Sequence, residues 1–378
     1  MKKAHFYSPI CPLLLIFFLT ISCKGQNIAD KQTRSTNTRD QALIIGDTVS
    51  EIADQKLNLV FQDTKENFWF TGGDGGIYKY DGKNLVLFTL KDGLCSLDIL
   101  GIQEDNFGNL YFDTPKGVSK FDGQKFSTLE IITGDSSKNE WKLGPDDLWF
   151  RMGWDQNGPY RYDGKALYQL EFPRTFQEDE FYSKYPNASY NPYGIYKIYK
   201  DSKGNIWFGT SSLGLCRYDG NSVSWLYEKQ LTDTPEGGSF GIRSIIEDRD
   251  GKFWFCNSHY RYAISPDSIV KKGTNSISYK RENGIGYSNE KGETEYPYFM
   301  SMEEDNDGDL WMASYDSGVW RKRGEELIHY PIKDGDTDVL LFSIYKDKKG
   351  IIWLGSHNEG AYKFNGSYFE KFNPIKQY

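Results

Sequence analysis

The chain has 378 residues and a formal net charge of −8, and 16% of its residues are aromatic. This length suffices for a large folded domain with a substantial core. A mildly acidic chain without a cluster of Lys and Arg is atypical of nucleic-acid-binding proteins, so we expect no nucleic acid among the partners.

Residues 1–23 have the pattern of a targeting segment. Lys2 and Lys3 precede an apolar stretch that is shorter than the ~20 residues needed to cross a bilayer. The segment ends in Leu-Thr-Ile-Ser-Cys23, which resembles the lipobox of bacterial lipoproteins. We therefore expect a signal peptide over 1–23, lipidation at Cys23 and an outer-membrane lipoprotein of the cell envelope. An ordinary cleaved signal peptide with a chance Cys is the alternative.

Residues 24–41 are polar, lack aromatic residues and show no periodicity, so they are predicted to form a flexible tether. The residues after Cys23, Lys-Gly-Gln, carry no acidic side chain. In lipoprotein sorting this favours the periplasmic side of the outer membrane, and surface exposure stays open. Cys95, Cys216 and Cys256 remain in the body and include no Cys-x-x-Cys pair, so neither a disulfide framework nor a Cys-based metal site is expected.

One phrase recurs seven times along residues 42–378: a turn with Asp and Gly, an apolar-aromatic strand, and then Gly-x-aromatic-x-aromatic-Asp-Gly. The clearest copy runs from Asp201 to Gly220. Its central aromatic recurs, in copies one to seven, as Trp69, Tyr111, Trp149, Trp207, Trp254, Trp311 and Trp353. Each copy offers four short strands, and no segment of twelve or more residues has a helical period. The prediction is an all-β seven-bladed β-propeller with four-stranded antiparallel blades.

These repeats resemble the two-component regulator propeller repeat, most strongly in copies one, two, four, six and seven. That family forms periplasmic sensors of bacterial hybrid histidine kinases and also occurs in free-standing exported proteins. The resemblance implies a sensor-like binding role. Copy three has an altered turn at 144–147, copy five lacks the Tyr-Asp-Gly hairpin, and residues 42–49 are expected to add a strand beside the last blade.

Strand order assigns the loops to two faces. The short repeated turns share one face, and the loops between second and third strands share the other, here called the top face, with the blade-to-blade connections. The connections 171–193 and 271–298 are long and rich in Tyr, and both are expected on the top face. Variable loops on a rigid scaffold often carry binding, and Tyr-rich loops suit sugars or proteins. The alternative is that these two connections only cover the central channel and bind no ligand.

The top loops therefore supply the candidate ligand-binding residues, which are Arg151, Trp154, Asp155, His259, Tyr260, Tyr315, Asp316, His357 and Asn358. We expect Trp154 to stack on a ligand and the polar groups to orient it. The expected function is a membrane-anchored binding or interaction module whose ligand is a glycan or a protein.

No catalytic residues, cofactor or metal site are predicted. His259 and His357 occupy equivalent loops two blades apart, and lone surface histidines are the competing interpretation. The acidic run at 305–309 departs from the EF-hand pattern and reads as a hairpin turn. A glycosidase- or lyase-like propeller enzyme remains the alternative function, and streptogramin lyases are propellers with a different repeat.

Overall fold

The computed structural model describes residues 45–374, apart from 53–55, 72, 74, 139, 233–239 and 358. The chain divides into two compact units, 1–42 and 43–378, and the fold is that of the second unit. The predicted signal peptide, Cys23 and tether lie outside the described residues, as does Asn358. None of the described helices is long and apolar enough to cross a membrane.

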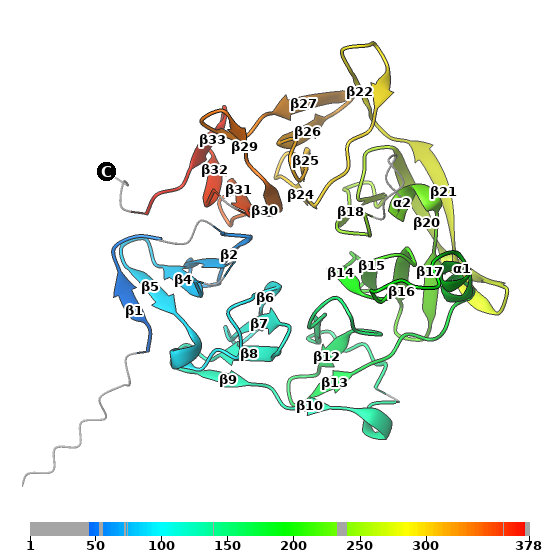
Figure 1. Cartoon of the computed structure of the whole chain (residues 1–378), viewed down its shortest axis with the longest axis horizontal. Helices are drawn as coiled ribbons and strands as arrows, with labels where there is room; N and C mark the ends of the chain where they lie inside the picture. Colours follow the sequence, from blue (N-terminus) through cyan, green and yellow to red (C-terminus); the bar gives the residue numbers. More distant parts are fainter. Residues whose placement is uncertain are drawn as a thin grey trace, which may run out of the picture. The chain divides into compact units, whose positions relative to one another are not determined.

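The described residues form twisted sheets arranged around a centre, and each copy of the repeat contributes one group of four strands (Figure 1). We number the sheets as blades 1 to 7 after their copies. Their strands, from the centre outward, are listed here by blade: β2 (Leu59–Gln62), β3 (Phe68–Thr71), β4 (Ile77–Tyr80) and β5 (Leu85–Phe88) in blade 1; β6 (Gly101–Glu104), β7 (Leu110–Thr114), β8 (Gly117–Phe121) and β9 (Phe126–Thr128) in blade 2; β11 (Leu148–Phe150), β12 (Tyr160–Tyr162), β13 (Leu167–Gln169) and β10 (Ile131–Ile132) in blade 3; β14 (Ile195–Lys200), β15 (Ile206–Thr210), β16 (Leu215–Tyr218) and β17 (Val223–Leu226) in blade 4; β18 (Ile245–Glu247), β19 (Phe253–Phe255), β20 (Tyr260–Lys271) and β21 (Thr274–Asn283) in blade 5; β24 (Ser301–Glu304), β25 (Leu310–Ala313), β26 (Val319–Arg323) and β27 (Glu326–Tyr330) in blade 6; β30 (Leu341–Lys346), β31 (Ile352–Ser356), β32 (Ala361–Phe364) and β33 (Phe369–Lys371) in blade 7.

This arrangement confirms the predicted all-β propeller with antiparallel blades, except that β10 joins blade 3 in parallel. The remaining elements lie in connections between blades: helices α1 (Phe176–Lys184) and α2 (Lys229–Thr232), the short 3-10 turns Leu90–Asp92 and Gly134–Ser136, and the strand pairs β22 (Tyr287–Ser288) with β23 (Thr294–Glu295) and β28 (Lys333–Asp334) with β29 (Thr337–Asp338).

The repeated phrase folds as one unit because its Asp forms hydrogen bonds with both the turn and the aromatic residue. In blade 4, Asp201 accepts hydrogen bonds from the backbone N–H of Asn205 (2.8 Å) and from the indole N–H of Trp207 (2.8 Å). Gly204 in this turn has φ +85°, which a residue with a side chain rarely adopts. The aromatic residue is fully buried and packs against the next blade, as in the pair Trp207–Phe253 with ring centroids 4.9 Å apart. The same turn at Asp305–Asp309 joins β24 to β25, as predicted.

Blade 3 departs from this plan in a way that shapes the centre of the molecule. Its strand nearest the centre is β11, which corresponds to the second strand of the other blades, and β10 pairs in parallel with β13 at the outer edge. Residues 140–147 form no strand. They run between blades 3 and 4, where Trp141 packs against Trp149 and Tyr218. The predicted innermost strand of this blade is therefore absent from the described residues.

The ring closes differently from the prediction. Strand β1 (Asp47–Val49) pairs antiparallel with β5 of blade 1, so it does not lie beside the last blade. Closure instead uses contacts between blades 7 and 1, including an antiparallel bridge between Leu57 and Ser356. Phe372, beyond the last strand, stacks on Phe70 of blade 1 with ring centroids 5.2 Å apart.

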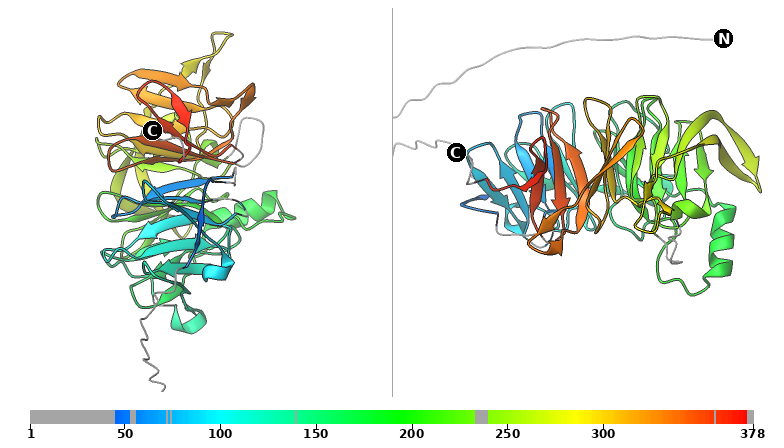
Figure 2. Two further views of the ribbon diagram at one scale, coloured as in Figure 1. Left: turned by 90° about the vertical axis from the view of Figure 1, so that its left-hand side faces the viewer. Right: turned by 90° about the horizontal axis from the view of Figure 1, so that it is seen from above.

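The break in copy five produces a long hairpin, β20–β21, in place of the usual short outer strands. Strand β21 pairs in parallel with β17 at Trp225 and Ser276, so blades 4 and 5 share one eight-stranded sheet. The long connections behave partly as predicted. Figure 2 shows α1, in the connection 171–193, projecting from the same face as the β28–β29 connection. Residues 271–283, however, belong to the hairpin, so only 284–298 lie among the top loops, where Ile285 N–H donates to Ser258 O (2.9 Å).

Candidate functional site

A cavity of about 540 Å³ occupies the centre of the ring and is lined mainly by the innermost strands of the blades. This volume lies within the range of roughly 300–1,000 Å³ that small-molecule sites occupy. Residues four and five positions before each turn Asp line its top part, including Leu59, Leu100, Gly101, Tyr196, Lys197, Arg243, Met300, Ser301, Phe342 and Ser343.

Arg151 spans the place where blade 3 lacks an innermost strand. Its guanidinium donates one hydrogen bond to Leu100 O of blade 2 (2.8 Å) and another to Tyr196 O of blade 4 (2.8 Å). Because these carbonyls belong to the flanking innermost strands, Arg151 ties together two blades that no strand of blade 3 connects. The candidate ligand residue is thus largely committed to the scaffold.

Asp113, at the end of β7, fixes the backbone around Arg151. Its carboxylate accepts the backbone N–H groups of Arg151 (3.0 Å) and Met152 (3.0 Å). Burial raises the pKa of this carboxyl to about 6, although the Arg151 charge and both N–H donors oppose the shift. The loop that carries Trp154 therefore starts from a fixed point.

Cationic and aromatic side chains gather on the blade 3 to blade 5 side of the cavity. The Arg243 guanidinium lies 4.2 Å from the ring centroid of Tyr196 and donates its Nε–H to Phe240 O (2.9 Å). Trp154 is 44% exposed and lies next to Arg151, whose guanidinium carbon is 5.6 Å from its ring. Lys197 lines the same wall, and burial lowers the pKa of its ammonium group. This side of the cavity can bind negative charge and flat apolar groups.

The opposite side is apolar and centres on Phe342 at the start of β30. Two of the candidate residues contact it: Tyr315 edge-on at 5.8 Å and His357 in a stack at 5.2 Å between ring centroids. His357 Nδ1 is buried without a hydrogen-bond partner among the described residues. These two residues thus support the wall of the cavity through Phe342.

The other candidates lie around the mouth of the cavity, except Asn358, which is outside the described residues. His259 stacks on Tyr260 and on Tyr296, with ring centroids 4.1 Å apart in both pairs. Asp155 and Asp316 are exposed. The structure therefore brings Arg151 and Trp154 to the cavity, Tyr315 and His357 to its supporting layer, and leaves His259, Tyr260, Asp155 and Asp316 around it.

The Tyr-rich connection before blade 4 joins the top loops of two blades. Asn191 donates to the Asp155 carbonyl (3.1 Å), and its own carbonyl accepts the Ser211 hydroxyl (2.7 Å). Tyr182, Tyr185 and Tyr190 remain partly exposed around the buried Phe181. This connection therefore presents an aromatic surface next to the Trp154 loop.

Reasoning from the sequence missed four residues that lie on the innermost strands or just before one: Tyr196, Lys197, Arg243 and Phe342. One signal for them was available. In the alignment on the turn Asp, positions four and five residues earlier hold Lys197 with Tyr196 in copy four and Arg243 in copy five, against mostly small or apolar residues elsewhere. A charge at a position facing the centre of a ring is informative because the interior is otherwise low in polarity.

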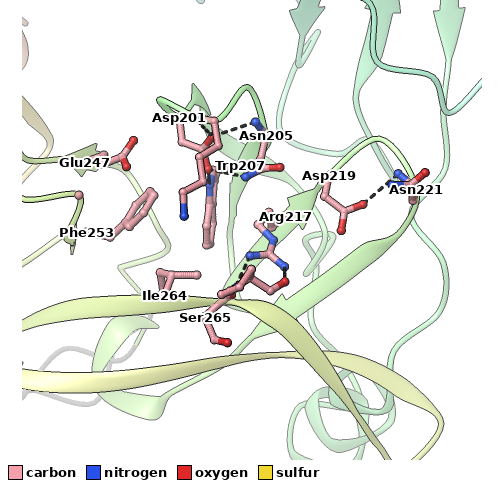
Figure 3. A pocket seen from close by; sticks show the side chains of 13 residues that line it. Asp201, Asn205, Trp207, Arg217, Asp219, Asn221, Glu247, Phe253, Ile264 and Ser265 are labelled. Atoms are coloured by element: carbon pink, nitrogen blue, oxygen red, sulfur yellow. Dashed lines mark hydrogen bonds between the residues drawn. The ribbon is translucent and has the colours of Figure 1, made fainter.

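A second pocket, of about 240 Å³, opens on the other face between blades 4 and 5 (Figure 3). It exists where copy five lacks its Tyr-Asp-Gly turn, and Arg217 forms its floor. Arg217 lies across from Trp207 on β16 and donates to Ser265 O and Pro266 O, both at 3.2 Å. The carboxylates that line this pocket accept hydrogen bonds within the repeated turns, as when Glu247 accepts the Ser202 N–H (2.7 Å). These are scaffold groups, so the central cavity is the stronger candidate.

The described residues contain no group of three or more His, Cys, Asp or Glu side chains placed to hold a metal ion. His259 and His357 contact different aromatic residues, Tyr260 and Phe342 respectively. Cys216 and Cys256 are buried, and burial raises the pKa of the Cys256 thiol to about 12, so this thiol is not a ready nucleophile.

Comparison with known families matches residues 189–212 to the two component regulator propeller. The matched stretch contains the last residues of the connection 171–193 together with β14 and β15 of blade 4, and it confirms the resemblance of the repeats to that family. A search of curated proteins gives no match.

Solved structures share the fold at low sequence identity. The extracellular domain assigned to a hybrid two component system of B. thetaiotaomicron aligns with a TM-score of 0.55 and 19% identity over 85% of this chain and 40% of that chain. Virginiamycin B lyase from Staphylococcus aureus aligns with a TM-score of 0.56 and 14% identity over 82% of this chain and 96% of the lyase. PorZ of Porphyromonas gingivalis, a surface component of the type-IX secretion system, aligns with a TM-score of 0.54 and 14% identity over 83% and 48%. At these identities the likeness concerns the propeller fold.

Proposed function

We propose that this protein is an envelope-located binding module that takes its ligand at the top mouth of the central cavity. The observation that carries the proposal is the 540 Å³ cavity, whose upper wall combines Trp154, Arg243 and Phe342 on a rigid ring. The repeated groups on the other face are hydrogen-bonded within their turns, whereas the top loops differ in every copy. A sensor-like role agrees with the repeat family and with the extracellular domain that shares the fold.

The position in the envelope is part of the proposal. Lipidation at Cys23 would hold the propeller at the outer membrane through the tether 24–41. Partition of the protein into a detergent phase, and its loss in Cys23→Ala, tests this anchoring. A Cys23→Ala protein that still partitions into detergent contradicts it.

The binding site is tested by screening the purified protein against glycan and protein arrays. Ligands found with the wild type are then measured with Trp154→Ala and with a deletion of 176–192. Phe107→Ala is a matched control, because Phe107 is 90% exposed in a turn on the other face. We expect binding to fall about fivefold or more for Trp154→Ala and to stay unchanged for Phe107→Ala, since stacking of a flat group on an aromatic ring contributes about 1–3 kcal/mol. Unchanged binding in both top-face variants refutes the proposal.

Incubation of the same protein with the ligands it binds, followed by analysis for products, separates a binding protein from a glycan- or small-molecule-active enzyme. Release of product would replace the binding role by the enzymatic alternative.

A further inference from the structure

We propose that the ligand of the central cavity is an organic anion, with one carboxylate-like group held by Arg243 and Lys197 and an apolar body directed toward Phe342. The inference rests on the proposed binding function and adds the chemical class of the ligand. Both cations and Phe342 line the same cavity from three different blades: Lys197 on β14, Arg243 two residues before β18, and Phe342 on β30.

Arg243 is positioned as a fork for an acidic group. Its Nε–H is fixed by Phe240 O (2.9 Å), and its plane lies over Tyr196 at 4.2 Å. The two terminal nitrogens have no hydrogen-bond or ion-pair partner among the described residues, where the guanidinium otherwise contacts only the rings of Tyr196 and Phe240. A guanidinium that is oriented through Nε and a ring keeps its remaining N–H groups available for two parallel bonds to a carboxylate.

Lys197 supplies a second positive charge four residues before the turn Asp201. Its ammonium group has no hydrogen-bond partner among the described residues, although it carries three donors. The walls of the cavity desolvate this ammonium group, and this burial lowers the pKa of Lys197. A bound anion would compensate this desolvation.

The other charges of the cavity leave room for one more negative group. Asp113 is occupied by two backbone N–H groups and by the charge of Arg151. Glu303 attracts Lys197 from blade 6, but burial raises the pKa of this carboxyl and Lys346 shares its charge. Asp98 lies beside Arg151, whose two terminal nitrogens already donate to backbone carbonyls. Arg243 is thus a cation of the cavity for which the described residues supply no acidic partner, and Lys200, which also lines the cavity, already donates to Pro145 O.

The apolar side of the cavity sets the second requirement. Phe342, Met300 and Leu59 line the wall that blades 7, 6 and 1 form. Burial of apolar area contributes about 25 cal/mol per Å². A ligand with an aromatic or aliphatic body and a single acidic group therefore matches both walls, whereas a small inorganic anion uses only the cations.

A matched pair of fluorescent probes tests the inference. 1-Anilinonaphthalene-8-sulfonate is an aromatic monoanion, and N-phenyl-1-naphthylamine has the same aromatic body without the charge. We expect saturable binding of one sulfonate probe per protein. Lys197→Met and Arg243→Gln should each weaken it about tenfold, because one charge-assisted contact is lost. The neutral probe should change less than twofold.

Lys165→Met and Arg174→Gln are the controls, because both side chains are exposed away from the cavity. Melting curves check that each variant is folded, and Lys197→Met keeps the test valid if Arg243→Gln does not fold. Equal binding of the charged probe by wild type and both cavity variants overturns the anion class. Equal binding of the two probes by the wild type also overturns it, but leaves the proposed binding function standing. If the wild-type protein binds no ligand in the array screen, the proposed function itself is refuted.

Discussion

Replacing the repeat tryptophan by phenylalanine should change stability by clearly different amounts in two blades. Trp311 of blade 6 donates its indole N–H to the Asp305 carboxylate at 2.8 Å. Trp149 occupies the same place in blade 3, where Leu143 stands at the position of the turn Asp, and the Trp149 indole N–H has no hydrogen-bond partner among the residues that the structure describes. The two indoles are 1% and 4% exposed, so burial removes the same area from water in both.

The magnitude follows from the hydrogen bond, because the change in volume cancels between the two variants. Trp311→Phe removes a bond to a charged acceptor, which contributes about 1.5–3 kcal/mol. Trp149→Phe removes a buried unsatisfied donor, whose burial costs about 1–3 kcal/mol. We therefore expect the free energy of unfolding to fall at least about 2 kcal/mol more for Trp311→Phe than for Trp149→Phe.

Urea unfolding followed by far-ultraviolet circular dichroism measures both variants without depending on tryptophan fluorescence. The comparison is valid when the dependence on urea keeps the same slope in wild type and variants. Equal losses of stability would show that the Asp–indole bond contributes nothing specific, and would refute the reasoning.

Further changes test the centre of the ring and its seam. Arg151→Ala should lower the free energy of unfolding by about 3 kcal/mol in urea melts, because the Leu100 and Tyr196 carbonyls lose their donors; an unchanged midpoint contradicts the bridging role. The pKa of Asp113 rises in the folded state from 3.8 to about 6, so the folded protein keeps a proton that the unfolded chain has lost, and stability falls as pH rises through this window. Asp113→Asn should remove about 3 kcal/mol of that dependence, and an identical pH profile in the variant would count against it. Phe372→Ala should destabilise by about 3 kcal/mol, with amide exchange rising first where blades 7 and 1 meet; uniform exchange would oppose this.

Local patterns made most of the fold predictable. The turn Asp, its Gly and the aromatic residue lie within seven positions of one another, and they fold together through short-range bonds such as Asp201 to Trp207. Burial of the repeat aromatics followed from their recurrence alone. The altered turn of copy three was visible at 144–147, yet loss of the strand depends on the path of 140–143 between two blades, which no local pattern encodes.

The site was less predictable because it depends on strand register. A β-bulge lies between Ile195 and Lys197, and a similar one lies between Leu341 and Ser343. Such an irregularity breaks the strict alternation of strand faces, so neighbours such as Tyr196 and Lys197 both line the cavity. Loop variability directed attention to Trp154 and Arg151, which line the cavity, but Lys197 lies on a strand that otherwise resembles the scaffold and Arg243 lies just before one.

Every blade of this ring comes from one continuous stretch of chain, and blades 7 and 1 meet without sharing a strand. A whole repeat can therefore be added or removed during evolution without rethreading the chain through a neighbouring blade. The circumference would adjust at the seam, where Phe372 packs against Phe70. The fused sheet of blades 4 and 5 is the exception, since those two copies can only be inherited together.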